Sequence, residues 1–412
     1  MQRLIPHRRK AAAIAAVMTA TIALSSCSSE PDAAEDMTFN GSYHMIEGGT
    51  SVLIEDTSIE IRNSLIYFPE DMETLYGQVS LSAEEKEIYD TLVKAIGDEE
   101  AAVPMVADGE VYTKILNLIG IEQMGFGHVS NRKVGAFDTE TQHFPVEFTY
   151  RFSCEEMSNM NRAAEAAANE IMNGVTSGMS VYDTLKYFHD YLITHCESDP
   201  EDIYANTIYG ALVRGKALCE GYAKSFSYLC NKAGIENIIV TGSTDTAHMW
   251  NMVKIDGNWY HVDVTWDKPD GSIAEMHPDM VLYQYFLVTD SVIENNHTIW
   301  TITSPPPKAY GTKENYFIKE GFYIDSEDKV EKGIENAIRN AIADGKHTAS
   351  VKFSTNNMLL STIHRMTDSA AGEGEYLKEQ IEKICMDFNI KLNVSWTDYY
   401  SSYRILVFVI DY

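Results

Sequence analysis

The sequence has little of what several common classes of protein require. Its six cysteines form no CxxC pair, and once Cys27 is set aside the remaining five leave at least one thiol unpaired, which argues against a disulfide framework. No close pair of ligands has the spacing of a zinc site, and neither a P-loop nor a dinucleotide fingerprint occurs. We therefore expect no metal and no cofactor. No internal repeat is evident.

Positive charge is also scarce. The 412 residues include 61 acidic and 32 basic side chains, a formal charge of −29. Residues 1–26 hold four basic and no acidic residues, so the charge of the remainder is −29 − 4 = −33. A surface of this sign repels phosphate backbones, and we expect no nucleic-acid partner. Solubility is the simpler explanation of the acidity; weak attraction of cationic or wall-associated partners is the other.

A long hydrophobic run occurs near the start of the sequence and nowhere else. Four basic residues precede an alanine-rich apolar stretch at 11–24, which is too short to cross a bilayer comfortably. Leu24-Ser25-Ser26-Cys27 resembles the lipobox of bacterial lipoproteins, in which Cys27 would be lipidated. We therefore expect a surface-exposed lipoprotein of a bacterial cell membrane, held by its lipid anchor alone. The alternative is a plain secretory signal peptide.

The richest stretch of the sequence runs from 214 to 266. Apolar residues recur behind Cys219 at helical spacing up to Ala233, and Gly234 is suited to end that helix. A short apolar strand at 235–240 follows. Two alternating segments, 248–255 and 258–266, then flank Asp256-Gly257, which is a strong signal for a two-residue hairpin turn.

The hairpin turn fixes which residues face each other. With a two-residue loop, the numbers of paired residues sum to 513, so Trp250 lies opposite Asp263 and His248 opposite Thr265. His248 and Asp263 are then diagonal neighbours on one face, roughly 7–8 Å apart at the backbone. A loop of odd length would place them on opposite faces. The turn therefore favours a His–Asp pair.

The position of Cys219 favours a reactive thiol. A helix N-terminus carries partial positive charge and free N–H groups, which lower a thiol pKa and can stabilise an oxyanion. A histidine oriented by a carboxylate would complete a nucleophile–base–acid arrangement for acyl transfer through a thioester. The simpler alternative is that Cys219 is a small apolar residue in the core, where free cysteines are common.

Three sequence blocks connect these residues to a known family. RGKALCEGYA, AHMWNMV and GNWYHVDVTWD resemble the three motif blocks of the transglutaminase-like superfamily, a papain-like group of cysteine acyl-transfer enzymes, and YDTLKYFHDYL and QYFLVTD extend the resemblance over roughly 80–305. It implies that Cys219 is the nucleophile, His248 the base and Asp263 the orienting acid, on a cysteine helix packed against an antiparallel sheet. Glu220 stands where animal transglutaminases carry tryptophan, and no calcium-loop pattern is apparent, which disfavours a calcium-activated cross-linker.

Other residues near these motifs have weaker claims. We expect Tyr222 and Trp250 to be core residues or an aromatic substrate wall, and His261, which lies opposite Met252 in the predicted register, to support the site or serve a structural role. His189 is expected to be a partly exposed helix residue. A second oxyanion donor is expected but cannot be assigned.

The chain divides into five predicted parts: a lipoprotein signal peptide and lipobox at 1–27, a tether and irregular β-containing segment at 28–79, a catalytic domain with a helical N-terminal part at 80–303, a Pro-rich linker at 304–309 and an α+β module at 310–412. The fold class is α+β. Expected helices are 81–96 with a Ser82–Glu85 capping box, 111–119, 155–172, 181–194, 330–343 and 376–388; expected strands are 146–154, 283–288, 316–324, 348–353, 391–396 and 403–410.

The function expected from these features is that of a surface-anchored cysteine peptidase, amidase or acyltransferase acting on a protein or peptide substrate, with hydrolysis slightly favoured. A non-catalytic binding module of the cell envelope with the same fold is the alternative. A third is a structural envelope protein that depends mainly on the C-terminal module.

Overall fold

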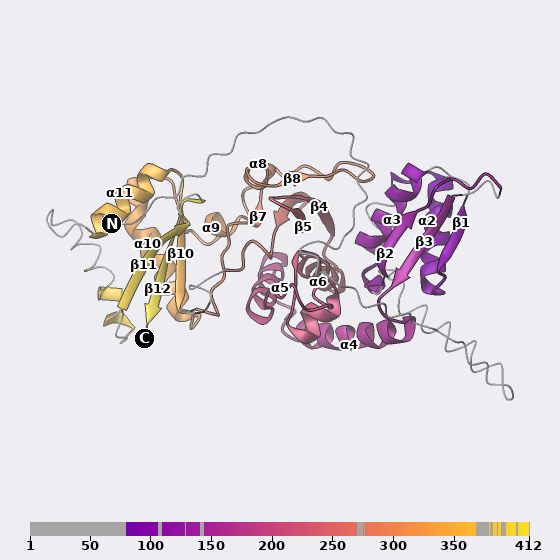
Figure 1. Cartoon of the computed structure of the whole chain (residues 1–412). Helices are drawn as coiled ribbons and strands as arrows, with labels where there is room; N and C mark the ends of the chain where they lie inside the picture. Colours follow the sequence, from indigo (N-terminus) through magenta and orange to yellow (C-terminus); the bar gives the residue numbers. More distant parts are fainter. Residues whose placement is uncertain are drawn as a thin grey trace, which may run out of the picture.

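The computed structural model describes residues 80–411 apart from 106–108, 128, 141–143, 270–274, 276, 368–378, 380–381, 385, 389–392 and 401–402. The predictions for 1–79, including Cys27 and the β-containing segment, lie outside the described residues. Of the helix predicted at 376–388, the described residues 379, 382–384 and 386–387 are helical. Three bodies follow one another along the molecule, the N-terminal and C-terminal ones on either side of a central domain (Figure 1).

The N-terminal body packs two helices on a small antiparallel sheet of order β1-β3-β2. Ser82 caps its first helix in a capping box with Glu85, as predicted, because each side chain satisfies a free backbone N–H of the first turn. Its elements are α2 (Ala83–Gly97), β1 (Ala102–Met105), α3 (Gly109–Glu122), the short 3₁₀ helix η2 (Met124–Phe126), β2 (Val129–Val134) and β3 (Phe144–Tyr150).

The central domain is a cluster of helices packed on a five-stranded antiparallel sheet of order β7-β6-β5-β4-β8. Gly234, with φ of 69°, follows the cysteine helix in the left-handed conformation that glycine adopts without strain. The elements are α4 (Cys154–Met172), α5 (Val181–His195), the π-helical turn η3 (Gly210–Arg214), α6 (Cys219–Lys232), β4 (Asn237–Ser243), β5 (Ala247–Ile255), β6 (Asn258–Val262), β7 (Phe286–Val288), α8 (Asp290–Ile293) and β8 (Thr298–Ile299).

The C-terminal body carries a four-stranded sheet of order β11-β12-β10-β9, in which the short pair β9–β10 is parallel. Alternating buried residues along β10 and a strongly one-sided α10 give its core. The elements are α9 (Tyr316–Lys319), β9 (Tyr323–Ile324), the 3₁₀ turn η4 (Glu327–Lys329), α10 (Val330–Ala343), β10 (Thr348–Phe353), α11 (Asn356–Thr367), β11 (Asn393–Tyr400) and β12 (Ile405–Asp411).

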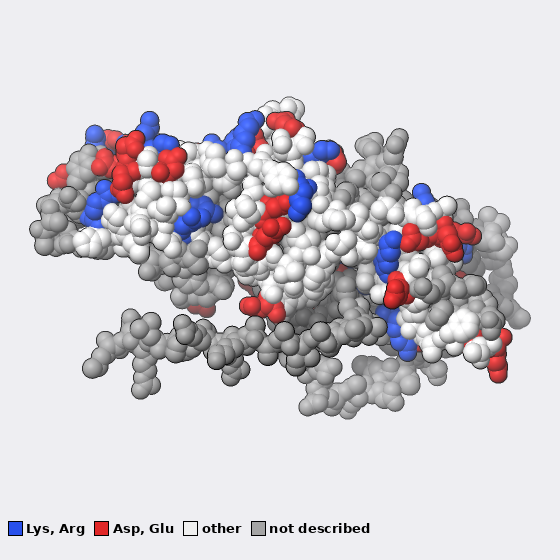
Figure 2. Space-filling model, turned by 90° about the horizontal axis from the view of Figure 1, so that it is seen from above, with Lys and Arg blue, Asp and Glu red and all other residues white. Residues whose placement is uncertain are grey.

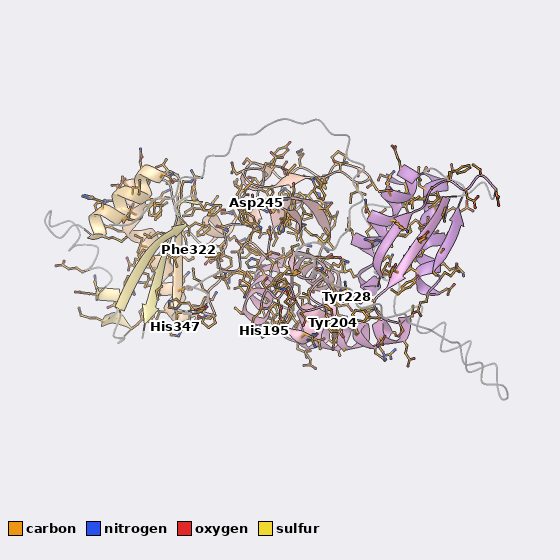
Figure 3. The ribbon with its side chains drawn as sticks, in the orientation of Figure 1. His195, Tyr204, Tyr228, Asp245, Phe322 and His347 are labelled. Atoms are coloured by element: carbon orange, nitrogen blue, oxygen red, sulfur yellow. The ribbon has the colours of Figure 1, made fainter. Side chains whose placement is uncertain are left out.

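One apolar cluster runs from the central domain into the C-terminal body, including Phe286 of β7 and Phe322 before β9. The rings of Tyr283 and Tyr316 stack at 3.6 Å across this contact. Figure 3 labels Phe322 at this contact, on the side of the C-terminal body that faces the central domain. The two bodies therefore share buried surface.

The predicted α+β class and the packing of the cysteine helix on an antiparallel sheet are confirmed. The strand predicted at 316–324 is wrong: helical hydrogen bonds form α9, and Gly321, with φ of 78°, separates it from a two-residue β9. α11 had no counterpart among the predicted elements.

Charge is distributed over the surface in mixed patches. On the face shown in Figure 2, acidic and basic side chains lie beside one another over the described parts of the molecule. Among the described residues, no helix is both long and apolar enough to cross a membrane.

Candidate active site

The β5–β6 hairpin has the register that the turn chemistry predicts. Asp256 and Gly257 have positive φ values of 49° and 80°, as a type I′ turn requires. Ile255 pairs with Asn258, and the ladder continues to the residue before Asp263. His248 and Asp263 consequently lie on one face, where His248 Nε2 donates to Asp263 Oδ2 at 2.7 Å.

Asp263 is fully buried and accepts three hydrogen bonds. Besides His248, His297 Nε2 donates to the same Oδ2 at 3.0 Å, and the backbone N–H of Trp266 donates to Oδ1 at 3.1 Å. Burial alone would raise the pKa of Asp263, but the two histidines hold it below its ordinary value. The carboxylate is therefore charged at neutral pH and can fix the orientation of His248.

His297 is a residue that sequence reasoning missed. It lies between α8 and β8 and is 3% exposed, and its Nδ1 hydrogen bonds with the side-chain oxygen of Asn296 at 2.8 Å. Nothing in its surrounding sequence has a motif or periodicity that could have identified it. Its contact with Asp263 spans 34 residues and depends on the folding of the whole sheet.

Aromatic rings surround His248. Trp250 stacks beside its imidazole at 5.9 Å between ring centroids and 20° between planes, and Trp266 meets it edge-on at 6.2 Å. Only 6% of the His248 side chain is exposed. Enclosure of this kind restricts the orientation of the ring and excludes bulk water from its hydrogen bond with Asp263.

His261 is held away from this pair. The indole N–H of Trp250 donates to His261 Nδ1 at 3.1 Å, so the proton of the neutral ring is on Nε2, which donates to Asp290 Oδ1 at 3.0 Å. Burial lowers the pKa of His261 to about 4. His261 opposes Met252, as the register predicts. Its partners make it a neutral ring that holds Trp250 in place.

Cys219 is the first residue of α6. Leu218 precedes it with extended backbone and offers no side-chain cap, so no side chain of the capping residue occupies the first N–H groups of the helix. Among the described cysteines, Cys154, Cys196 and Cys230 are buried and Cys219 alone is partly exposed. Burial raises the pKa of Cys154 and Cys196 to about 12.

Two side-chain contacts define how α6 lies along the sheet. Asn251 of β5 donates its side-chain N–H to the carbonyl of Ala223 at 2.9 Å. Farther along both elements, Ser227 donates to Asn237 of β4 at 2.6 Å, and Asn237 is opposite Val253 of β5. The helix and β5 therefore advance in the same direction, side by side.

Tyr222 points into the helical core. It is 1% exposed, and its hydroxyl donates to the carbonyl of Cys196 at 3.2 Å, at the end of α5. Burial raises the pKa of this phenol, as expected of a structural tyrosine. Trp250 is as deeply buried but lies beside His248, so of the two aromatic residues singled out from the sequence, Trp250 has the contact with the predicted base.

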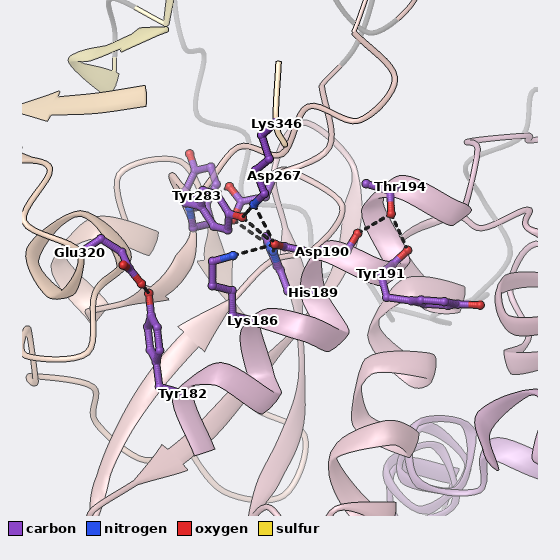
Figure 4. Close-up of polar contacts among 11 residues, drawn as sticks. Tyr182, Lys186, His189, Asp190, Tyr191, Thr194, Asp267, Tyr283, Glu320 and Lys346 are labelled. Carbon is purple, nitrogen blue, oxygen red and sulfur yellow. Dashed lines mark hydrogen bonds and ion pairs between the residues drawn. The ribbon is translucent and has the colours of Figure 1, made fainter. Parts of the chain in front are cut away.

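The prediction that His189 is partly exposed is wrong. His189 is fully buried on α5, where its Nε2 lies 3.0 Å from Asp267 Oδ2 and its Nδ1 lies 3.3 Å from Asp190 Oδ1 (Figure 4). Burial raises the pKa of Asp267 to about 6. Asp267 lies four residues after Asp263, so a second His–Asp pair joins α5 to the turn that follows β6.

His248, Asp263 and His297 are also the described residues whose donor atoms come close enough to suggest a metal, within 4.8 Å of one another. Tetrahedral zinc with bonds of about 2.05 Å keeps its ligands roughly 3.3 Å apart. The two N···O separations, 2.7 and 3.0 Å, are shorter than this. The distances match hydrogen bonds better than coordination, and the side chains would have to separate to hold an ion.

Comparison with known proteins identifies the same region. Residues 165–264 match the family model described as the transglutaminase-like superfamily. Human kyphoscoliosis peptidase is 28% identical over 128 residues, and its mouse counterpart is 25% identical over 130; each match covers 26% of this chain and 19% of the relative. The chain thus spans about a fifth of the length of these curated relatives. A solved structure described as a TGase gives a TM-score of 0.25 at 13% identity, covering 39% of this chain and 48% of that one.

Proposed function

We propose that the chain is a cysteine acyl-transfer enzyme, on the premise that its central domain, in which residues 165–264 match the family model, is of the transglutaminase-like superfamily. Cys219 is the nucleophile, His248 the base and Asp263 the acid that orients it. The observation that carries the proposal is the buried His248–Asp263 hydrogen bond on the strand that runs beside the cysteine helix. The hairpin register places the two side chains on one face, and the 2.7 Å contact shows that they meet there.

The alignment of α6 with β5 supports the pairing of Cys219 with His248. One turn back from Ala223 brings the helix to Cys219, a step of about 6 Å. On β5, Met249 lies two residues before Asn251, a step of about 6.6 Å along the strand. Met249 and Ala223 belong to the same apolar cluster. His248 is one residue farther back, a total step of about 9.9 Å, so the start of the helix and the predicted base lie toward the same end of the α6–β5 pair.

The hydrogen bond with Asp263 also selects the nitrogen that reacts. Because His248 Nε2 donates to the carboxylate, Nδ1 is the nitrogen left to take the proton of the thiol. The sulfur of Cys219 attacks the carbonyl carbon of an amide, and the N–H groups at the helix start stabilise the oxyanion. The C–N bond then breaks, the amine leaves with the proton from His248, and a thioester remains.

Either water or an amine can resolve the thioester. Water gives a peptidase or amidase, and an amine gives transamidation. We favour hydrolysis because the curated relatives carry the name peptidase. The substrate is then a protein or peptide, and an enzyme held at the surface by a lipid on Cys27 would meet such substrates outside the cell or in the wall. Incorporation of labelled palmitate into the wild-type chain but not into Cys27→Ala would test the anchor.

The catalytic proposal is tested with denatured casein as a general substrate and a fluorescent primary amine as acceptor. Acid quenching should trap an acyl group on Cys219 in the wild type, with mass spectrometry locating it, and Cys219→Ala should carry none. New peptide N-termini indicate hydrolysis, and fluorescence in the casein indicates transamidation. Equal turnover by wild type and Cys219→Ala would overturn the assignment. A folded wild type whose Cys219 reacts with iodoacetamide no faster than a buried cysteine would instead favour a non-catalytic binding module.

A further inference from the structure

A groove of about 750 Å³ lies between the central domain and the C-terminal body. One wall comes from the end of β7 and from α8, and the other from the end of β10 and the start of β12. Tyr285 and Tyr403 both line it, and their ring centroids lie 5.8 Å apart. The hydroxyls of both approach the side-chain N–H group of Asn296, the residue before His297. Asn296 thus joins the lining of the groove to the candidate active site.

The groove differs from the rest of the molecule in charge. The chain has 61 acidic and 32 basic residues, yet none of the described residues that line the groove is Asp or Glu. Its two charged side chains, Lys352 and Arg404, are both cationic. Their neighbours in the lining are hydroxyls, amides and apolar side chains, so the groove is a positive site in an acidic protein.

Neither cation forms an ion pair with a carboxylate of the described residues. No described acidic side chain lies within ion-pair distance of Lys352, whose amine lies 5.6 Å from the centre of the Phe317 ring. The Arg404 guanidinium donates to a neutral acceptor, the carbonyl of Ser354. Burial and the nearby guanidinium lower the pKa of Lys352 to about 8. The only opposite charge of a described residue that acts on Lys352 is the more distant one of Asp267, with which it forms no ion pair. An anion bound between the two half-buried cations would stabilise both.

An unpartnered acceptor narrows the class of ligand. Gln284 lines the groove and is 4% exposed; its N–H group donates to the carbonyl of Trp266, but its side-chain oxygen has no partner in the described structure. A buried acceptor of this kind needs a donor. Val292 and Ile318 add apolar surface. A ligand with an anionic group, an N–H donor and an apolar body satisfies all three features, which a simple inorganic anion does not.

The backbone is strained at two points of the lining. Leu287 and Arg404 have φ values of 56° and 60°, and they are two of the four described non-glycine residues with positive φ. Such conformations are strained and cluster at ligand sites. We propose that this groove binds a peptide through its carboxylate, which Lys352 and Arg404 hold while an amide N–H donates to Gln284. The site does not require chemistry at Cys219.

The test is calorimetric titration of the purified full-length chain carrying Cys219→Ala, so that acyl transfer cannot consume the probe. N-acetyl-alanyl-alanine supplies the carboxylate, and its C-terminal amide is the matched neutral probe. We expect the acid to bind at least about tenfold more tightly than the amide. Lys352→Met and Arg404→Asn should each weaken binding of the acid by about tenfold or more. Asn is chosen because it tolerates positive φ.

Lys329→Met is the control, because Lys329 is a surface lysine outside the groove that pairs with Asp325. It removes one positive charge and should leave the affinity unchanged. Equal binding of acid and amide, unchanged affinity in Lys352→Met and Arg404→Asn, or no saturable binding of the acid up to about 10 mM would overturn the proposal. So would inorganic phosphate binding more tightly than the acid and displacing it. If a variant fails to fold, the comparison of acid with amide on the parent chain still decides.

Discussion

Asp263→Asn is the substitution that most directly separates an active site from a structural His–Asp pair. The carboxylate accepts from His248, His297 and the Trp266 N–H. An amide can retain the bond from Trp266, but its NH₂ group then faces two imidazole nitrogens that now donate. To accept from that NH₂ group, His248 must move its proton to Nδ1, and the nitrogen that we assign to the thiol can no longer take a proton.

The size of the effect follows from the ionisation of the thiol. An ordinary thiol with pKa near 8.5 is roughly 0.3% thiolate at pH 6, so loss of the thiolate–imidazolium pair can slow alkylation by at most about 300-fold, or roughly 3.4 kcal/mol. A hydrogen bond with a charged partner contributes about 1.5–3 kcal/mol, which corresponds to roughly 10- to 150-fold. We therefore expect Asp263→Asn to slow alkylation of Cys219 within that range.

The assay is pseudo-first-order labelling with iodoacetamide at about pH 6, with modified cysteines identified by peptide mass spectrometry. Cys154, Cys196 and Cys230 are buried and provide internal references for slow labelling. Asp290→Asn is the matched control, because it weakens another buried His–Asp contact, with His261, on the same sheet. It should leave the labelling of Cys219 unchanged. Labelling of folded Asp263→Asn within about twofold of wild type would refute the proposed roles, since even the weakest charged hydrogen bond predicts more.

Three further predictions concern stability and binding. Asp190→Ala should lower the free energy of unfolding, measured in urea, by about 3 kcal/mol. The substitution removes the carboxylate shared by Lys186, Lys346, His189 and the Tyr283 hydroxyl (Figure 4). A loss below about 1 kcal/mol would contradict this. The free energy of unfolding should fall as the pH drops below about 4, because folding lowers the pKa of Asp190 and Asp263. A carboxyl group whose pKa is lowered in the folded state stabilises the fold above its ordinary pKa and loses that contribution in acid. Urea titrations of Asp263→Asn should therefore show a shallower decline with falling pH. Affinity for N-acetyl-alanyl-alanine should weaken as the pH rises through about 8, where Lys352 loses its charge. The charged groups that act on Lys352 are Arg404 and, more distantly, Asp267. Calorimetry of Lys352→Met should show no such pH dependence of the affinity.

Local chemistry explains why the hairpin could be predicted in detail. Asp256-Gly257 admits the positive φ values of a two-residue turn, and the period of two along each strand then assigns every side chain to a face. The contact between His248 and Asp263 follows from this arithmetic together with the side-chain lengths. The helix behind Cys219 was predictable for a similar reason, since its apolar spacing and Gly234 define both its face and its end.

The partners of these residues could not be predicted in the same way. His297 reaches Asp263 across 34 residues, and His189 reaches Asp267 across 78. A lone histidine on a helix has no local feature that separates an exposed side chain from one buried against an acid on another element, and His189 was misjudged for that reason. The strand predicted at 316–324 failed because its β-branched and aromatic residues fit a helical turn once Tyr316 stacks on Tyr283.

The position of Asp263 depends on a long-range backbone clamp. Its N–H donates to the carbonyl of Tyr285 at 3.2 Å, and the N–H of Tyr285 donates to the side chain of Asp267 at 2.9 Å, so one residue holds both ends of the turn at 263–267. The Tyr285 hydroxyl meets Asn296, which in turn contacts His297, the second donor to Asp263. The same tyrosine lines the groove beside Lys352 and Arg404. A ligand that moved Tyr285 would therefore act on the acid through both its backbone and its second histidine, which gives the C-terminal body a physical route to the candidate active site.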